Sequence, residues 1–174
     1  MTIAIDTAGL HPTTLSCLEA LQWLRCEHSW HNVLDIGCGN GILSLAAADL
    51  CHTPGQPVKL VAADISPQAV ADAQALYARH PVGHYGTVLR SEGFKDPLIR
   101  GHAPYHLIIC NLLAEPITAW SRDMQTHLAP GGVCLLSGIL AWLAPELEAA
   151  YTRLGFEIIH RIDRSPWVTY AMRY

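Results

Sequence analysis

Residues 32–47 read NVLDIGCGNGILSLAA, and this stretch restricts the folds open to the chain more than any other. A short apolar run leads into three glycines at alternate positions, Gly37, Gly39 and Gly41, and an apolar stretch of helical character follows. Glycines between a buried strand and a helix let the backbone turn tightly and approach a ligand closely. The pattern predicts a strand–loop–helix unit of an α/β fold, with a ligand at the loop.

Strand-like and helix-like segments alternate along the rest of the chain. We expect helices at residues 14–27, 41–50, 66–77, 115–128 and 145–154. We expect strands at residues 33–36, 59–63, 86–90, 105–110, 133–137, 156–163 and 167–174. The last two strands are separated by three residues only, which makes them antiparallel neighbours, while the other strands suit a mostly parallel sheet covered on both faces. The prediction is one α/β domain over residues 1–174 with an antiparallel end.

The composition bounds the class of protein. Hydrophobic residues make up 51% of the 174 residues and charged residues 15%, against a usual charged share of about 25%. This balance indicates a folded, apolar globule, whose excess apolar area is either a large core or a face covered by a partner subunit, as in a homo-oligomer. The net charge of −4 and the scattered lysines and arginines argue against a nucleic-acid partner.

The cysteines and the hydropathy pattern predict a cytoplasmic location. The six cysteines are scattered, form no C-x-x-C pair, and suit buried thiols of a reducing compartment. No signal peptide is evident at the N-terminus. The longest charge-free stretch, residues 128–145, is interrupted by Pro130-Gly131-Gly132 and by Gly138, so we expect no membrane span.

The residues around the glycines exclude a phosphate-bearing ligand. A dinucleotide site has the pattern G-x-G-x-x-G, and Ile42 stands where its third glycine would fall. Asp35, two residues before Gly37, would repel a pyrophosphate. A cationic ligand suits the loop better, because Asp35 can accept an ammonium group directly or through water.

Asp64 ends the next predicted strand, 23 residues beyond Gly41. A carboxylate at this spacing can accept both hydroxyls of a ribose; the other interpretation is a turn residue before Ser66-Pro67. An amino acid joined to a nucleoside without phosphates would satisfy both Asp35 and Asp64. S-adenosylmethionine is such a molecule.

The two motifs DIGCGNG and AADISP, at residues 35–41 and 62–67, resemble those of S-adenosylmethionine-dependent methyltransferases. The resemblance covers nearly the whole chain. It implies a Rossmann-like sheet of seven strands that ends in an antiparallel hairpin. It also implies cofactor contacts at Thr14, Asp35, Gly37, Cys38, Gly39, Gly41, Asp64, Ile65 and Asn111.

Four further stretches are similar to the PrmA family, whose bacterial enzymes methylate amino groups of a large-subunit ribosomal protein. They are LHPTTLSCLEAL, NLLAEPI, LAPGGVCLLSGIL and the terminal PWVTYAMR. The resemblance implies that Thr14 lies beside the cofactor and that Asn111 lies next to the transferred methyl group. It also implies substrate contacts at His11, Asn111 and Leu112.

The residues themselves suit these roles to different degrees. The amide oxygen of Asn111 could accept a proton from a substrate amine and aim the nitrogen lone pair at the methyl group; Asn111 could also cap the following helix. His11 has the simpler interpretation of fixing the turn before Pro12.

Trp142 lies between two predicted turns. It either contacts substrate or has no role in a site. Cys26, His28 and His31 fall close together by chance, and we expect no metal site.

The chain departs from the family pattern F-G-T-G-x-H-P-T-T at Asp6, Thr7 and Ala8, so the segment over the cofactor is expected to differ. The family carries an N-terminal substrate-recognition domain, and residues 1–174 are expected to be the catalytic domain alone. We therefore expect methyl transfer from S-adenosylmethionine to an amino group. The acceptor that we expect first is a protein, such as a ribosomal protein. Two alternatives stay open: methylation of a small amine, and a non-catalytic module that binds S-adenosylmethionine.

Overall fold

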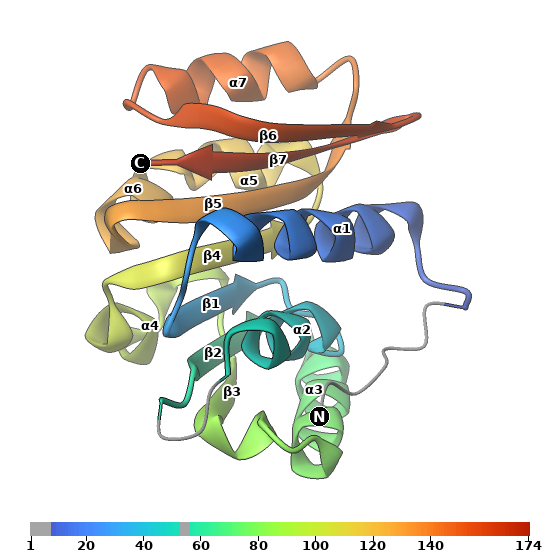
Figure 1. The fold of residues 1–174 in the computed structure, drawn as a ribbon, viewed down its shortest axis with the longest axis vertical. Helices are drawn as coiled ribbons and strands as arrows, with labels where there is room; N and C mark the ends of the chain where they lie inside the picture. The colour runs from blue at the N-terminus through green and yellow to red at the C-terminus, as the bar shows by residue number, and fades with distance from the viewer. Residues whose placement is uncertain (1–7, 53–55) are drawn as a thin grey trace.

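The computed structural model describes residues 8–52 and 56–174, and it confirms the predicted α/β class. One sheet of seven strands has the order β3-β2-β1-β4-β5-β7-β6 (Figure 1). The strands from β1 to β5 run parallel, and β7 is antiparallel to both β5 and β6. Their bounds are β1 Asn32–Ile36, β2 Lys59–Asp64, β3 Gly86–Arg90, β4 Tyr105–Asn111, β5 Leu128–Leu140, β6 Glu157–Arg164 and β7 Trp167–Arg173.

Helices cover both faces of the sheet. One face packs against α1 Pro12–Glu27, α2 Ile42–Cys51 and α3 Pro67–Arg79. The other packs against α4 Pro97–His102, α5 Ala114–Ala119, α6 Ser121–His127 and α7 Ala144–Thr152 (Figure 1). Two 3₁₀ turns, η1 Gly83–Tyr85 and η2 Gly93–Lys95, flank β3.

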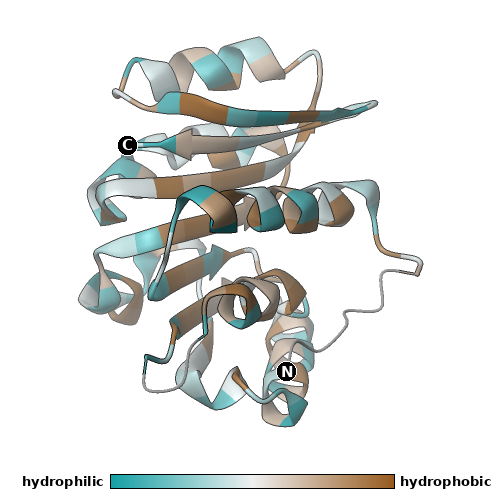
Figure 2. Cartoon of the chain, in the orientation of Figure 1, coloured by the Kyte–Doolittle hydropathy of each residue, from teal (hydrophilic) through white to brown (hydrophobic). Residues whose placement is uncertain are grey.

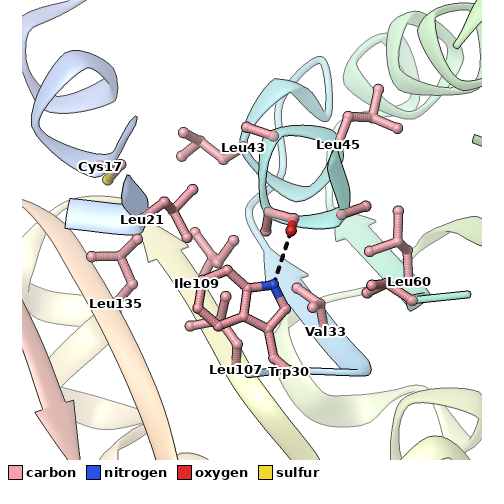
Figure 3. Close-up of a cluster of buried hydrophobic side chains, with 14 of the residues drawn as sticks. Cys17, Leu21, Trp30, Val33, Leu43, Leu45, Leu60, Leu107, Ile109 and Leu135 are labelled. Atoms are coloured by element: carbon pink, nitrogen blue, oxygen red, sulfur yellow. Dashed lines mark hydrogen bonds between the residues drawn. The ribbon is translucent and has the colours of Figure 1, made fainter. Parts of the chain in front are cut away.

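Alternate residues of each strand supply two cores, as the period of two requires. In β1, Val33 belongs to the core under α1 and α2, and Leu34 to the core on the opposite face. Figure 2 shows the resulting hydrophobic colour along the central strands. Trp30 is buried in the first core, where its indole N–H donates to the carbonyl oxygen of Ala47 at 2.9 Å (Figure 3). This bond satisfies the polar atom of the ring and ties the start of β1 to α2.

Three elements differ from the sequence-based expectation, among them β5, which spans Leu128–Leu140 and not residues 133–137 alone. The single helix predicted at residues 115–128 is wrong, because the chain leaves helical geometry at Trp120 (φ −89°, ψ 9°) and forms α5 and α6. The strand β5 then starts at Leu128. Helix α4 was not expected, although Asp96-Pro97 is a good helix start: the Asp96 carboxylate accepts from the N–H of Leu98 at 2.8 Å.

The cysteines follow the prediction only in part. Four of them are buried, whereas Cys26 is exposed and Cys51 is half-buried, and all six are free thiols. Within residues 8–52 and 56–174, none of the helices is both long enough and apolar enough to cross a membrane.

Candidate functional site

The strand order places a crevice at the carboxyl end of β1. β2 lies on one side of β1 and β4 on the other, so the connections that leave β1 and β4 diverge at this edge. Three predicted site segments meet here: the loop at residues 37–41, the end of β2 at Asp64 and the end of β4 at Asn111. The topology therefore brings together residues that are up to 74 positions apart along the sequence.

Three backbone amides of the glycine loop donate hydrogen bonds within the protein. The N–H groups of Gly37 and Cys38 donate to the carbonyl oxygen of Ala63, at 2.8 and 3.1 Å. The N–H of Gly39 donates to a carboxylate oxygen of Asp64 at 3.0 Å. A phosphate-binding loop needs such amides free. The geometry therefore agrees with the expectation of a phosphate-free ligand. The paired amides disfavour a phosphate in addition to the charge of Asp35.

Two glycines of the loop are required by close packing. Gly37 has φ +72°, and a Cβ there would lie 2.7 Å from the side chain of Leu112. Gly41 has φ +78°, and a Cβ there would lie 2.8 Å from the ring of Tyr77. Gly41 is buried at the start of α2, so packing gives a reason for glycine at this position; its predicted contact with the cofactor stays a prediction.

Asp35 lies below the loop and is only 1% exposed. Its carboxylate accepts from the N–H of Ser44 at 3.2 Å, and the Ser44 hydroxyl accepts from Tyr77 at 2.8 Å. Burial raises the pKa of Asp35 to about 7, against the lowering effect of the Ser44 hydrogen bonds, and the nearby charge of Asp64 raises it further. Because the carboxylate faces Ser44, an ammonium group in the crevice would sense its charge through water or through space more readily than by contact.

Asp64 has both carboxylate oxygens at the crevice. One accepts from Gly39, and the other accepts from the N–H of Ser66 at 2.9 Å. The side chain is half-buried, and each oxygen has a second lone pair that a hydroxyl could use. Asp64 also lines a cavity with Ile36, Gly37, Ile65, Ser91, Glu92, Gly93, Leu112 and Trp120.

The far end of this cavity holds residues that sequence analysis missed. Gly93 has φ +57°, and a Cβ there would lie 2.6 Å from the indole of Trp120. Trp120 also meets Phe94 edge-on, with ring centroids 6.1 Å apart. Trp120 and Ile65, which is 58% exposed, are thus apolar side chains that line the same cavity as Asp64. Only the break of the predicted helix at Trp120 reveals this role, and no proline or glycine marks that break in the sequence.

Asn111 lies at the other side of the glycine loop, next to α1. Its amide nitrogen donates to the hydroxyl of Thr14 at 3.5 Å, which leaves the amide oxygen directed elsewhere. Behind it, Ser137 is the neighbour of Asn111 across β4 and β5, and its buried hydroxyl lies 2.6 Å from that of Thr169. Ser137 also donates to the carbonyl oxygen of Thr13 at 3.4 Å. This buried polar set holds the start of α1 against the sheet.

The remaining predicted contacts have clear local roles. The Nδ1 atom of His11 accepts from the N–H of Thr13 at 3.3 Å, so His11 caps α1, in agreement with its simpler interpretation. The His11 ring is exposed and meets Trp167 edge-on. Leu112 packs on Gly37, as described above. Asp6 and Thr7, where the family pattern changes, lie outside the described residues.

The histidines form no metal centre in the part of the chain that the structure describes. Across residues 8–52 and 56–174, no group of three or more His, Cys, Asp or Glu side chains has a geometry that could hold a metal ion. His31 and His106 approach each other at the amino end of β1, with ring centroids 6.1 Å apart. Burial lowers the pKa of His106, and the charge of His31 lowers it further.

Comparison with known proteins identifies one family. The model of the family described as "Ribosomal protein L11 methyltransferase (PrmA)" matches residues 4–174. A ribosomal protein L11 methyltransferase of Sinorhizobium fredii is 37% identical over 161 residues, which cover 92% of this chain and 54% of the relative. One from Brucella suis is 35% identical and covers 95% and 56%. The chain thus spans about half the length of the curated relatives that it matches.

Solved structures share the fold. The ribosomal protein L11 methylase of Lactobacillus delbrueckii subsp. bulgaricus superimposes with a TM-score of 0.77 at 24% identity, over 94% of this chain and 79% of that one. An RNA methyltransferase of Salinibacter ruber, solved with S-adenosyl-L-homocysteine, gives a TM-score of 0.64 at 14% identity, over 94% and 91%.

Proposed function

Because the chain belongs to the ribosomal protein L11 methyltransferase (PrmA) family, we propose that it transfers a methyl group from S-adenosylmethionine to an amino group of a protein. The observation that supports this most directly is the state of the glycine loop. The amides of Gly37, Cys38 and Gly39 donate to Ala63 and Asp64, and the carboxylates of Asp35 and Asp64 lie close to the loop. Such a loop favours a cationic nucleoside without phosphates.

The cavity suits each part of this cofactor. Asp64 would hold the ribose hydroxyls, and Ile65 and Trp120 would enclose the adenine from two sides. The methionine part would lie along Gly37 and Gly39, with its ammonium group in the field of Asp35. Thr14 and Asn111 would then flank the methyl group, in line with the predicted contacts. When bound, the cofactor supplies a methyl group on a sulfonium, which is an activated leaving group.

Asn111 carries the proposed positioning of the acceptor. With its nitrogen donating to Thr14, its amide oxygen can accept a hydrogen bond from the neutral amine and point the lone pair of the amine at the methyl carbon. In such a transfer the N–C bond would form as the C–S bond of the cofactor breaks, and the electron pair of the C–S bond would stay on sulfur. The amine loses its proton to water. Alignment of this kind can supply up to ~7–11 kcal/mol of the barrier for a well-oriented pair.

The protein acceptor is proposed to be ribosomal, which is what the names of the relatives state for them. The test is transfer of a labelled methyl group from S-adenosylmethionine to ribosomal proteins, compared with a panel of small amines. Incorporation into one ribosomal protein at its lysines or α-amine supports the proposal. Incorporation only into small amines would move the chain to the alternative class of small-molecule N-methyltransferases.

The cofactor and the role of Asn111 are tested separately. Calorimetry should show binding of S-adenosylhomocysteine and none of NAD; the reverse result would overturn the proposal. Asn111→Ala should lower kcat about 10- to 100-fold, because a hydrogen bond to a group that gains charge contributes about 1.5–3 kcal/mol. The Kd for S-adenosylhomocysteine should stay within about twofold. Turnover at the wild-type rate would remove Asn111 from the mechanism.

A further inference from the structure

The two most exposed large hydrophobic side chains among the described residues are Trp142, at 69%, and Leu113, at 65%. Leu113 comes directly after Asn111 and Leu112 and is the last residue before α5. Trp142 lies in the turn between β5 and α7. A single exposed apolar residue is ordinary, but two of this size at the ends of neighbouring strands indicate a surface that is covered in use.

The residues that follow these two side chains in the sequence line one groove. Ala114 and Leu143, the next residues after Leu113 and Trp142, line a surface groove of about 390 Å³ between α5 and α7, together with Glu115, Thr118, Ala119 and Glu146. We refer to this groove, together with Leu113 and Trp142, which directly precede two of its lining residues, as the acceptor groove. Leu112 lines the cofactor cavity and Ala114 lines the acceptor groove, so three consecutive residues connect the proposed site of methyl transfer with this surface.

The charge of the groove identifies the kind of partner. Glu115 and Glu146 are both exposed, one on each wall, and among the described residues neither makes a hydrogen bond or an ion pair. Glu148, a little further along α7, contrasts with them: it is engaged by Arg161 and by the Tyr170 hydroxyl. A carboxylate in the first turn of a helix is stabilised by the helix dipole, but this does not explain the exposure of Trp142 and Leu113 beside the groove.

We propose that the acceptor groove docks a positively charged polypeptide segment that carries the amine to be methylated. Its basic side chains would face Glu115 and Glu146, and its aliphatic stems would cover Trp142 and Leu113. This inference rests on the proposed function, since it places the acceptor amine near Asn111. The inference adds that the residues around the acceptor amine are basic, and that the acceptor groove is the surface that binds them.

The test uses two fluorescein-labelled peptides with one lysine as acceptor, flanked by arginines in the first and by glutamines in the second. Fluorescence anisotropy, with the full chain and S-adenosylhomocysteine, measures their Kd values. The arginine-flanked peptide should bind at least about fivefold more tightly, and more so at low salt. Trp142→Ala should weaken its binding about 10- to 30-fold, as expected for a tryptophan at the centre of an interface.

Charge substitutions distinguish docking from general attraction by a protein of net charge −4. The double variant Glu115→Gln with Glu146→Gln should raise the Kd of the arginine-flanked peptide about 4- to 25-fold. It should leave the Kd of the glutamine-flanked peptide unchanged. Glu115→Lys with Glu146→Lys should reverse the preference toward a glutamate-flanked peptide. Glu27→Gln, an exposed carboxylate at the end of α1, is the matched control and should leave both Kd values unchanged.

Each outcome assigns the failure to one proposal. Equal binding of the two peptides by the wild type, or wild-type affinity in both Trp142→Ala and the double glutamine variant, would overturn the acceptor groove. Self-association in sedimentation that Trp142→Ala abolishes would assign the surface to a second copy and would overturn it as well. If the peptides bind as expected but receive no labelled methyl group, the docking surface stands and the proposed function fails.

Discussion

The two halves of the carboxyl edge of the sheet are built in opposite ways. At the β1–β2 edge, which we define as residues 35–41 with Asp64, the polar groups described above have internal partners: Ala63 and Asp64 take the loop amides, and Ser44 donates to Asp35. At the β4–β5 edge, residues 111–114 with 140–143, Leu113 and Trp142 are exposed. The polar groups of the first half are paired before a ligand arrives, whereas the second half leaves free carboxylates and apolar area that a partner would cover.

This difference matches what each half is proposed to bind. The cofactor is one rigid molecule of fixed shape, so a preformed site minimises the ordering that binding costs. A protein acceptor brings its own backbone and side chains, and exposed apolar side chains with free carboxylates can adapt to it. The preformed β1–β2 edge lowers the stability of the protein, however, because burial is unfavourable for the charge of Asp35.

The contrast is tested most strongly at Asp35. Its folded pKa of about 7 exceeds the ordinary value of 3.8, so the folded state holds a proton that the unfolded chain releases as the pH rises above about 4. Stability without cofactor is therefore unaffected by this group below pH 4, falls between pH 4 and 7, and stays reduced above 7. Three units correspond to about 4 kcal/mol.

The variant Asp35→Asn removes this ionisation and keeps an oxygen for the N–H of Ser44. Its free energy of unfolding in urea should exceed that of the wild type by up to about 4 kcal/mol at pH 8 and should equal it near pH 4. The exposed Asp72→Asn serves as the control for the removal of one carboxylate from the surface. Parallel stability curves for wild type and Asp35→Asn would show that Asp35 is not strained and that the β1–β2 edge has no such cost.

Asp64 is expected to give the next largest effect, on cofactor affinity. Asp64→Ala removes the proposed acceptor of both ribose hydroxyls and also releases the N–H groups of Gly39 and Ser66. Two charge-assisted bonds at about 1.5–3 kcal/mol each predict at least a 100-fold rise in the Kd for S-adenosylhomocysteine by calorimetry. An unchanged Kd would remove the ribose assignment and leave Asp64 as a turn residue.

A third test compares two glycines of the same loop. Gly41→Ala would force a Cβ to 2.8 Å from the Tyr77 ring at a positive φ, whereas Gly39→Ala meets no atom within 4 Å at φ +54°. The left-handed conformation costs about 1–2 kcal/mol for alanine in both variants. The contact adds to this only at Gly41, so we expect a loss of about 2–4 kcal/mol there and about 1–2 kcal/mol at Gly39 in urea unfolding. Equal losses would show that Tyr77 does not hold the loop.

The β1–β2 edge could be predicted from sequence, because its features are local. The strand, the three glycines and the helix after them are contiguous, and Asp64 follows at a fixed spacing. The roles within the loop could not be read in this way. The direction of Asp35 toward Ser44, and the packing of Tyr77 beneath Gly41, depend on how α2 and α3 pack, which periodicity does not specify.

Residues of the cavity that come from distant segments were missed for the same reason. The indole of Trp120 faces Gly93, and the break between α5 and α6 that allows this has no sequence signal. The contact between Ser137 and Thr169 also joins strands that come from different parts of the chain. The family resemblance implied a place beside the cofactor for Thr14 and for Asn111, but the hydrogen bond between them, across 97 residues of sequence, was not predicted.

The smallest effect is expected at the β4–β5 edge, where adjacent leucines should behave differently. Leu112 packs on Gly37 and is half-buried, so Leu112→Ala should lower the free energy of unfolding by about 1–3 kcal/mol. Leu113 is 65% exposed, so Leu113→Ala should change it by less than about 0.5 kcal/mol. Urea unfolding at one pH measures the free energy of unfolding of both variants. A loss at Leu113 as large as that at Leu112 would mean that Leu113 is buried in the folded protein in solution, and the β4–β5 edge would then be as complete without a partner as the β1–β2 edge.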